Sequence, residues 1–144
     1  MNLKVALLQL LPGKGLTEQT MIGKKACEQA KAMGAHIALF PEMWSSGYYI
    51  PQDEKAVNEL SVSVKDDFVH GFRALAADLE MAIGITFLER HEPRPLNSSF
   101  FLTEKGRKCF IILRYKIVFD RNRQLVYSFL ILWDVISTAP HLWE

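Results

Sequence analysis

The sequence predicts an α/β domain in which helices cover one face of a mixed β-sheet. Short apolar runs alternate with segments of helical periodicity through most of the chain, and a pair of apolar runs then flanks a tight turn. The 144 residues are enough for one domain with a sizeable core. A composition of 49% hydrophobic and 23% charged residues is typical of a globular protein. The net charge of +1 gives no electrostatic signature for binding nucleic acid or an anionic membrane surface.

The first part of the chain has the pattern of a strand–helix–strand unit. Residues 4–10 form a compact apolar run that predicts a buried strand. A helical pattern opens at Thr17, and Gly34 is well suited to end it. Residues 36–40 predict a second strand, which Pro41 ends because proline cannot donate a hydrogen bond to a sheet ladder. This order predicts a right-handed βαβ unit with parallel strands.

The next part of the chain predicts a loop, a second helix and three more strands. Residues 45–61 have the composition of a loop, and Ser63 is a candidate N-cap for the second helix. Residues 82–88 predict a third buried strand. Residues 98–103 and 108–115 predict a hairpin around a turn that contains glycine. Two helices are therefore expected to cover the sheet.

We divide the chain into a domain at residues 1–120 and a tail at 121–144, where the strand and turn signals are lost and no structure is predicted. The N-terminus lacks the features of a signal peptide. Two cysteines are too few for a disulfide scaffold and have no metal-ligand spacing. We therefore expect a reducing, cytoplasmic location.

Glu42 is the first candidate for a catalytic role. It directly follows a predicted strand, and ligands bind at the carboxyl ends of strands in parallel α/β sheets. Walls formed by Phe40, Trp44 and Tyr48 would partly desolvate the carboxylate and suit it to work as a general base. The alternative is a surface-loop glutamate beside a proline, with the aromatic residues packed in the core. Position alone favours this alternative.

Lys116 and the two cysteines are the other candidates. Lys116 ends an apolar strand, from which an ammonium group can stabilise a developing oxyanion. A strand-end lysine with its charge in water is the commoner situation. A nucleophilic thiol needs a positive centre nearby to lower its pKa. Cys27 lies within a predicted helix, and Cys109 lies in a strand with the basic residues Arg107 and Lys108 before it, but neither cysteine sits at a strand-to-helix turn. We therefore favour packing roles for both cysteines.

Several segments within residues 3–116 follow one another in a recognisable order. They are KVALLQL at 4–10, GAHIALFPEM at 34–43, Gly47-Tyr48, Gly84-Ile85, Glu89, Asn97-Ser98, Gly106 and Arg114-Tyr115-Lys116. Together they resemble the N-terminal portion of carbon–nitrogen hydrolases of the nitrilase superfamily. The individual segments are only moderately specific, and their order makes the resemblance strong.

The resemblance implies part of a four-layer αββα sandwich that hydrolyses non-peptide carbon–nitrogen bonds in amides, carbamoyl compounds or nitriles. It implies a glutamate, lysine and cysteine catalytic set with no metal or organic cofactor. Glu42 would be the general base, first for the thiol and later for a water molecule. Lys116 would stabilise the tetrahedral intermediate, and a cysteine would form the acyl-enzyme.

The chain departs from the family pattern after Lys116, where Ile117-Val118 replaces the usual histidine and no later residue is cysteine. We therefore expect the chain to lack the nucleophile and to be inactive alone. One alternative is a non-catalytic half-domain that associates with full-length relatives. Another is a small-molecule-binding α/β domain unrelated to nitrilases. The partners we expect are a small amide or nitrile and a second copy of the chain, which would associate through an exposed sheet, but neither nucleic acid nor membrane.

Overall fold

The computed structural model describes residues 2–103, 105, 108–109 and 115–116. Within these residues there are six strands, namely β1 (Val5–Leu7), β2 (Ile37–Leu39), β3 (Ala82–Glu89), β4 (Leu96–Leu102), β5 (Lys108–Cys109) and β6 (Tyr115–Lys116). The helices are α1 (Leu16–Ala32), α2 (Glu54–Leu60), α3 (Asp67–Asp78) and the 3₁₀ helix η1 (Trp44–Ser46).

The strands form one mixed sheet, as the sequence predicts. Its order is β1-β2-β3-β4-β5, and β6 also pairs with β4. The β1–β2 and β2–β3 pairs are parallel, whereas β4 runs antiparallel to β3, β5 and β6. The predicted α/β class with parallel strands in the first unit is therefore confirmed.

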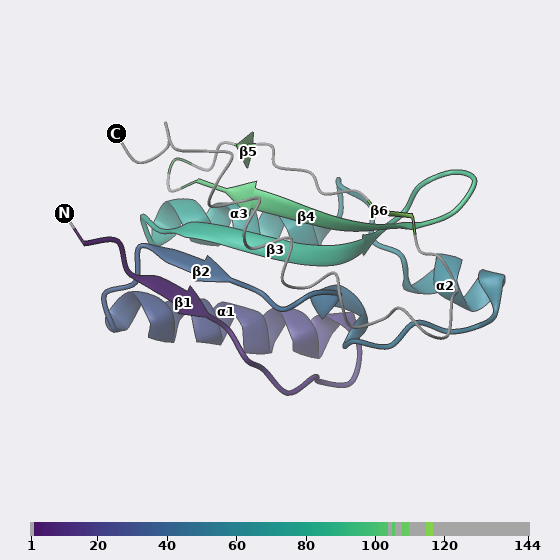
Figure 1. The fold of residues 1–144 in the computed structure, drawn as a ribbon, viewed down its shortest axis with the longest axis horizontal. Coiled ribbons are helices and arrows are strands. Elements are labelled where there is room, and N and C mark those ends of the chain that lie inside the picture. Colours follow the sequence, from purple (N-terminus) through teal and green to yellow (C-terminus); the bar gives the residue numbers. More distant parts are fainter. Residues whose placement is uncertain (1, 104, 106–107, 110–114, 117–144) are drawn as a thin grey trace.

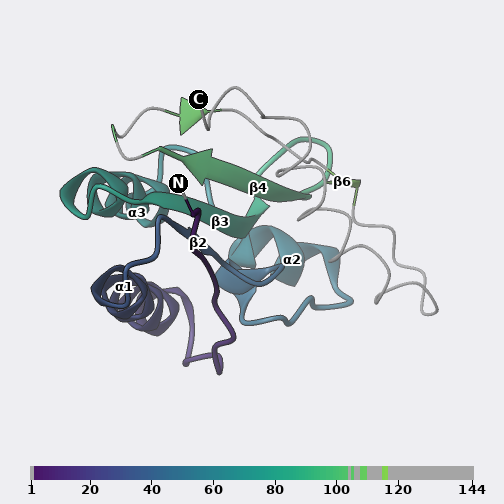
Figure 2. The ribbon, with the colours of Figure 1, turned by 60° about the vertical axis from the view of Figure 1, so that its left-hand side comes forward.

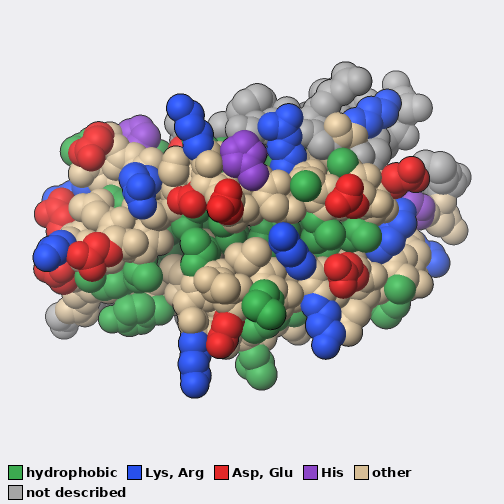
Figure 3. All heavy atoms as spheres, turned by 180° about the vertical axis from the view of Figure 1, so that it is seen from behind, with side chains coloured by type: hydrophobic (Ala, Val, Ile, Leu, Met, Phe, Trp, Pro, Cys, Tyr) green, Lys and Arg blue, Asp and Glu red, His purple; other side chains and the backbone are tan. Residues whose placement is uncertain are grey.

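Helices α1 and α3 lie side by side on the same face of the sheet (Figures 1 and 2). The core between them is rich in aromatic rings. Phe72 packs edge-to-face against Phe40, with ring centroids 5.1 Å apart, and against Phe68, with centroids 5.2 Å apart. Such pairs add roughly 0.5–1.5 kcal/mol each to the stabilisation from burial. The outer surface of this helical layer carries charged side chains of both signs (Figure 3).

Strand β1 differs from the prediction in its burial. Val5 and Leu7 are 37% and 59% exposed, whereas residues 37–39 of β2 are buried. Among the described residues, β1 pairs with β2 alone, so it forms an edge of the sheet. Its apolar composition predicted a fully buried strand, but edge position leaves one side chain in two exposed.

Helix α1 is bounded by glycines at both ends. Gly15 is its N-cap with φ 90°, and Gly34, with φ 81°, follows its C-terminal end as predicted. A positive φ strains residues with a Cβ atom, which explains glycine at these two positions. The side chain of Gln19 is buried and accepts a hydrogen bond from the N–H of Gly13 at 2.6 Å, which ties the preceding loop to the helix.

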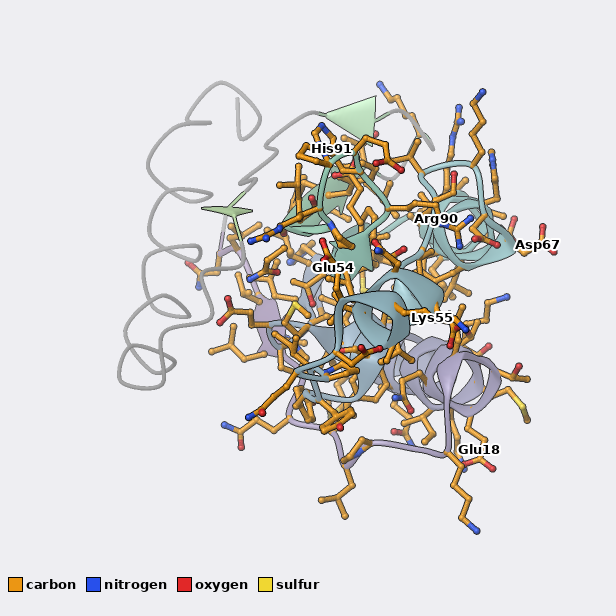
Figure 4. All side chains as sticks on the ribbon, turned by 90° about the vertical axis from the view of Figure 1, so that its right-hand side faces the viewer. Glu18, Glu54, Lys55, Asp67, Arg90 and His91 are labelled. Carbon is orange, nitrogen blue, oxygen red and sulfur yellow. The ribbon has the colours of Figure 1, made fainter. Side chains whose placement is uncertain are left out.

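The segment predicted to be a loop at residues 45–61 contains η1 and α2. The Asp53 carboxylate accepts a hydrogen bond from the N–H of Ala56 at 2.9 Å and caps α2. Glu54 and Lys55 of α2 lie at the end of the molecule that Figure 4 faces, together with Arg90 after β3. The loop prediction was wrong because the cap and a single buried apolar residue are enough to fix a seven-residue helix.

Helix α3 starts later than expected. Asp66, rather than Ser63, occupies the N-cap position. The Asp66 carboxylate accepts a hydrogen bond from the N–H of Ser63 at 3.3 Å, so the two residues form a turn that precedes the helix. The predicted cap at Ser63 is therefore wrong by three residues.

The predicted hairpin is recovered in part. Strand β4 is slightly longer than the predicted strand at 98–103, and β5 and β6 lie within the second predicted strand at 108–115 or extend it by one residue. The predicted tail at 121–144 lies outside the described residues. In the part of the chain that the structure describes, no helix is both long and apolar enough to cross a bilayer.

Candidate active site

The loop that carries Glu42 begins where β2 leaves the sheet. The N–H of Phe40 donates to the carbonyl of Gly84 at 2.9 Å, which extends the β2–β3 contact one residue beyond β2. Pro41 follows and has no N–H to donate. The backbone then turns at Met43, which has φ 58° and ψ 33° in the left-handed region. Glu42 therefore sits between a proline and a strained residue.

A side chain from the neighbouring strand holds both sides of this turn. The hydroxyl of Thr86 on β3 donates to the carbonyl of Pro41 and accepts a hydrogen bond from the N–H of Trp44 at 3.2 Å. Thr86 is 4% exposed. One buried hydroxyl therefore joins the backbone before Glu42 to the backbone after Met43.

Further hydrogen bonds fix the turn after Met43. The carbonyl of Met43 accepts from the N–H groups of Ser46 and Tyr48, both at 3.2 Å, and from the Ser46 hydroxyl at 3.1 Å. The Ser45 hydroxyl accepts from the N–H of Leu88 on β3 at 3.0 Å. The loop is thus tied to β3 at two successive points.

The Glu42 side chain meets a residue of β4. The Nδ2 atom of Asn97 donates to Oε1 of Glu42 at 2.5 Å. Both side chains are partly buried. The contact therefore orients the Glu42 carboxylate toward the start of β4.

Lys116 lies in β6, whose backbone pairs with the same end of β4. In this register Tyr115 is opposite Asn97 and Lys116 is opposite Leu96. The backbone of the second predicted catalytic residue is therefore next to the strand that holds Glu42. The position of its ammonium group stays a prediction.

The two cysteines were expected to have packing roles. Cys27 is completely buried in α1, within the core beneath the sheet. Burial, and to a smaller extent the charge of Glu28, raises the pKa of the Cys27 thiol to about 12. A thiol that is protonated at neutral pH is a poor nucleophile, in agreement with a packing role. The Cys109 side chain lies outside the described residues.

The aromatic residues predicted to surround Glu42 lie partly in the core and partly at the surface. Trp44 is fully buried, with its ring 5.7 Å from that of Phe40, so the core-packing interpretation holds for this residue. Tyr48 is 42% exposed and its hydroxyl donates to the carbonyl of Leu10 at 2.9 Å. Partial burial raises the pKa of Tyr48 above its ordinary value.

No role was predicted for Thr86 from the sequence, and Asn97 was noted there only as part of the Asn97-Ser98 segment. Thr86 is a polar residue within the apolar run at residues 82–88, and buried polar groups are nearly always hydrogen-bonded. That signal was available in the sequence. The partner of Asn97 was not, because Glu42 lies 55 positions away. Among the described residues, no three His, Cys, Asp or Glu side chains lie close enough together to hold a metal ion.

The fold is that of the nitrilase superfamily. An amidase from Nesterenkonia sp. superposes with a TM-score of 0.62 and 21% identity over 75% of this chain and 41% of its own. A cysteine-to-serine mutant of the Nesterenkonia AN1 amidase from the nitrilase superfamily superposes with a TM-score of 0.62 and 20% identity, over 79% of this chain and 42% of its own. The C. elegans NitFhit protein gives 0.67 and 15%, over 81% of this chain and 28% of its own.

The sequence model of the carbon-nitrogen hydrolase family matches residues 4–128, and the chain belongs to this family. No curated protein matches the sequence. The chain spans about two fifths of the length of the amidases with which it superposes. Family membership excludes the interpretation as an α/β domain unrelated to nitrilases.

Proposed function

We propose that the chain carries the glutamate and lysine of a carbon–nitrogen hydrolase site but not its nucleophile. In this proposal Glu42 is the general base and Lys116 stabilises the oxyanion of the tetrahedral intermediate. The observation that carries the proposal is the position of Glu42 at the carboxyl end of β2. There Asn97 holds it, from a strand that also pairs with the Lys116 backbone.

The substrate class proposed for the complete site is a small amide. The Nesterenkonia amidase has been solved with butyramide and with acrylamide, and acrylamide also adds to its active-site cysteine in a glutamate variant. A base beside the thiol would take its proton as sulfur attacks the amide carbonyl, and would return it to the nitrogen as the carbon–nitrogen bond breaks and ammonia leaves. It would later activate water against the resulting thioester. The residues after Lys116 offer no thiol for the first step.

Ammonia release from acrylamide and butyramide tests whether the chain acts alone. We expect no release above that of the Glu42→Gln variant at any protein concentration. Turnover in the unchanged chain that disappears in Glu42→Gln would show that the chain supplies its own nucleophile, and the proposed inactivity would be wrong.

Cross-linking tests the proposed proximity of Glu42 and Lys116 without requiring turnover. In a Cys27→Ala and Cys109→Ser background, the pair Glu42→Cys and Lys116→Cys should be joined by a short bifunctional thiol reagent. The matched control pairs Glu42→Cys with Lys105→Cys, because Lys105 follows the opposite end of β4 from Asn97. Equal cross-linking of both pairs, or of neither, would contradict the proposed site.

A second candidate function is that of a non-catalytic half-domain that binds a second copy of the chain or a full-length relative. The exposed edge strand β1 favours it, since Val5 and Leu7 leave apolar surface beside an edge that pairs with no other described strand. Leu7→Lys should lower the associated fraction in sedimentation or light scattering. Met21→Lys, on the exposed side of α1, is the control. A monomeric unchanged chain that also fails to co-purify with a full-length relative would remove this candidate.

A further inference from the structure

We infer that Thr86 is a positioning residue that fixes the backbone on both sides of Glu42, so that the carboxylate meets Asn97. The inference rests on the proposed function only for its catalytic meaning. The geometric claim concerns Thr86, the turn at Glu42 and Asn97, and it can be tested without any turnover.

The turn needs an external support because the parallel ladder stops short of it. The contact between the N–H of Phe40 and the carbonyl of Gly84 lies just before Pro41. Pro41 has no N–H to donate, and Met43 adopts a left-handed conformation that costs a residue with a side chain about 1 kcal/mol or more. A left-handed non-glycine residue persists where its surroundings over-determine it.

Thr86 supplies this support with one hydroxyl group. Its hydrogen goes to the carbonyl of Pro41, and its oxygen accepts the N–H of Trp44. The group therefore continues the contact between β2 and β3 by a side chain, just beyond the backbone bond at Phe40. The two bonded positions enclose Glu42 and Met43 and nothing else.

The opposite end of the Glu42 side chain has its own contact. Asn97 of β4 donates to the carboxylate, and Asn97 itself lies opposite Leu88 of β3. The backbone on either side of Glu42 is thus held by Thr86 of β3, and the carboxylate meets Asn97 of β4, the strand paired with β3. A shift of the turn away from β3 would separate Glu42 from Asn97.

The side-chain amide signal of Asn97 in a nitrogen–proton NMR spectrum reports this geometry directly. In the unchanged chain we expect the signal to be displaced from that of Asn58, which is exposed on α2. Thr86→Val keeps the shape of the side chain but removes the hydroxyl. In this variant the Asn97 signal should move to the region of Asn58, and in Thr86→Ser it should return.

Thr20→Val is the matched control, since the Thr20 hydroxyl also bonds a backbone carbonyl, that of Leu16 at 2.7 Å, but on α1. It should leave the Asn97 signal unchanged even if it lowers the melting temperature. A folded Thr86→Val protein with an unchanged Asn97 signal would overturn the inference. So would a Thr86→Ser protein that resembles Thr86→Val.

Amide exchange in the unchanged chain provides a test that needs no variant. The N–H of Trp44 should exchange about tenfold more slowly than that of an exposed loop residue, because it is buried and bonded to Thr86. Rapid exchange at Trp44 would overturn the inference even if Thr86→Val does not fold. Failed cross-linking of Glu42→Cys with Lys116→Cys would instead count against the proposed function and leave this result untouched.

Discussion

Asn97 on β4 donates a hydrogen bond to Glu42 at the end of β2, although β3 lies between these two strands in the sheet. The contact is possible because Glu42 belongs to the loop beyond β2 and Asn97 lies near the start of β4, which runs antiparallel to β3. The end of β2 and the start of β4 therefore lie at the same end of the strands. This contact is the structural centre of the candidate site.

Removing the donor should therefore lower the stability of the protein. We expect Asn97→Ala to reduce the free energy of unfolding by about 1.5–3 kcal/mol, the usual range for a hydrogen bond to a charged group. A double-mutant cycle with Glu42→Gln, followed by urea denaturation, should give a coupling of about 0.5 kcal/mol or more. Asn58→Ala on exposed α2 is the control and should change stability by less than about 0.5 kcal/mol. Strict additivity would contradict the contact.

Two glycines in facing helices should respond in opposite directions to the same substitution. A Cβ atom on Gly23 of α1 would lie 2.8 Å from the ring of Phe40 and 2.9 Å from that of Phe72. Gly23→Ala should therefore destabilise the protein by about 1–3 kcal/mol through overpacking. A Cβ atom on Gly71 of α3 would lie 3.1 Å from Nζ of Lys24, which can move. Gly71→Ala should stabilise by about 0.5–1 kcal/mol through helix propensity.

Thermal or urea unfolding of the two glycine variants checks this prediction. Because both substitutions add the same methyl group to the same kind of element, their difference isolates the packing against the aromatic rings. Destabilisation of similar size by both variants would show that the aromatic core does not lie against α1 as described.

Glu80 follows α3 with φ 45°, a left-handed conformation that favours glycine. Glu80→Gly should therefore stabilise the protein by about 0.5–1 kcal/mol, while Glu80→Ala keeps the strain and should have little effect. Gly34 occupies the corresponding position after α1, and Gly34→Ala should cost about 1 kcal/mol. Equilibrium denaturation of these three variants gives the comparison. A stabilising Gly34→Ala would contradict the assigned conformation.

The Cys27 thiol should be unreactive in the folded protein. In a Cys109→Ser background, labelling by a disulfide reagent at pH 8 should be slow until denaturant is added, because the thiol is buried and its pKa is about 12. Fast labelling under native conditions would exclude the buried position of Cys27.

The same shift predicts a pH dependence of stability. Burial raises the pKa of Cys27 from 9.0 to about 12, so between these values the unfolded chain loses the thiol proton and the folded chain keeps it. The contribution of this group is therefore present below pH 9 and is lost as the pH rises toward 12. We expect the free energy of unfolding of Cys27→Ala, measured in urea, to change less with pH in this range than that of the unchanged chain.

Local pattern predicted the elements of the fold better than their surroundings. The parallel strands β1 and β2 and the glycine after α1 follow from apolar runs and helix-ending signals within a few residues. Exposure of β1 does not, because an edge strand and a central strand have the same composition and differ only in their neighbours. Helix α2 was missed because seven residues give too few turns for a periodic signal.

In the candidate site too, the local feature was predicted and the long-range contacts were not. Glu42 was predicted by its position after a strand and by the family resemblance, and its loop lies where expected at the end of β2. Its contact with Asn97 and the tie from Thr86 depend on the sheet order β2-β3-β4. Pairing partners many residues away are set by tertiary packing, which a single sequence does not reveal.

The supports of the Glu42 loop come from β3 and β4, which are synthesised after it. During translation, β1, α1 and β2 leave the ribosome first, but the turn acquires its Thr86 contact only when β3 has emerged. It acquires the Asn97 contact later still. A nascent chain ending before Asn97 would hold the opening βαβ segment without this hydrogen bond to the Glu42 carboxylate. The Glu42 loop therefore reaches its final structure only after β3 and β4 have been synthesised.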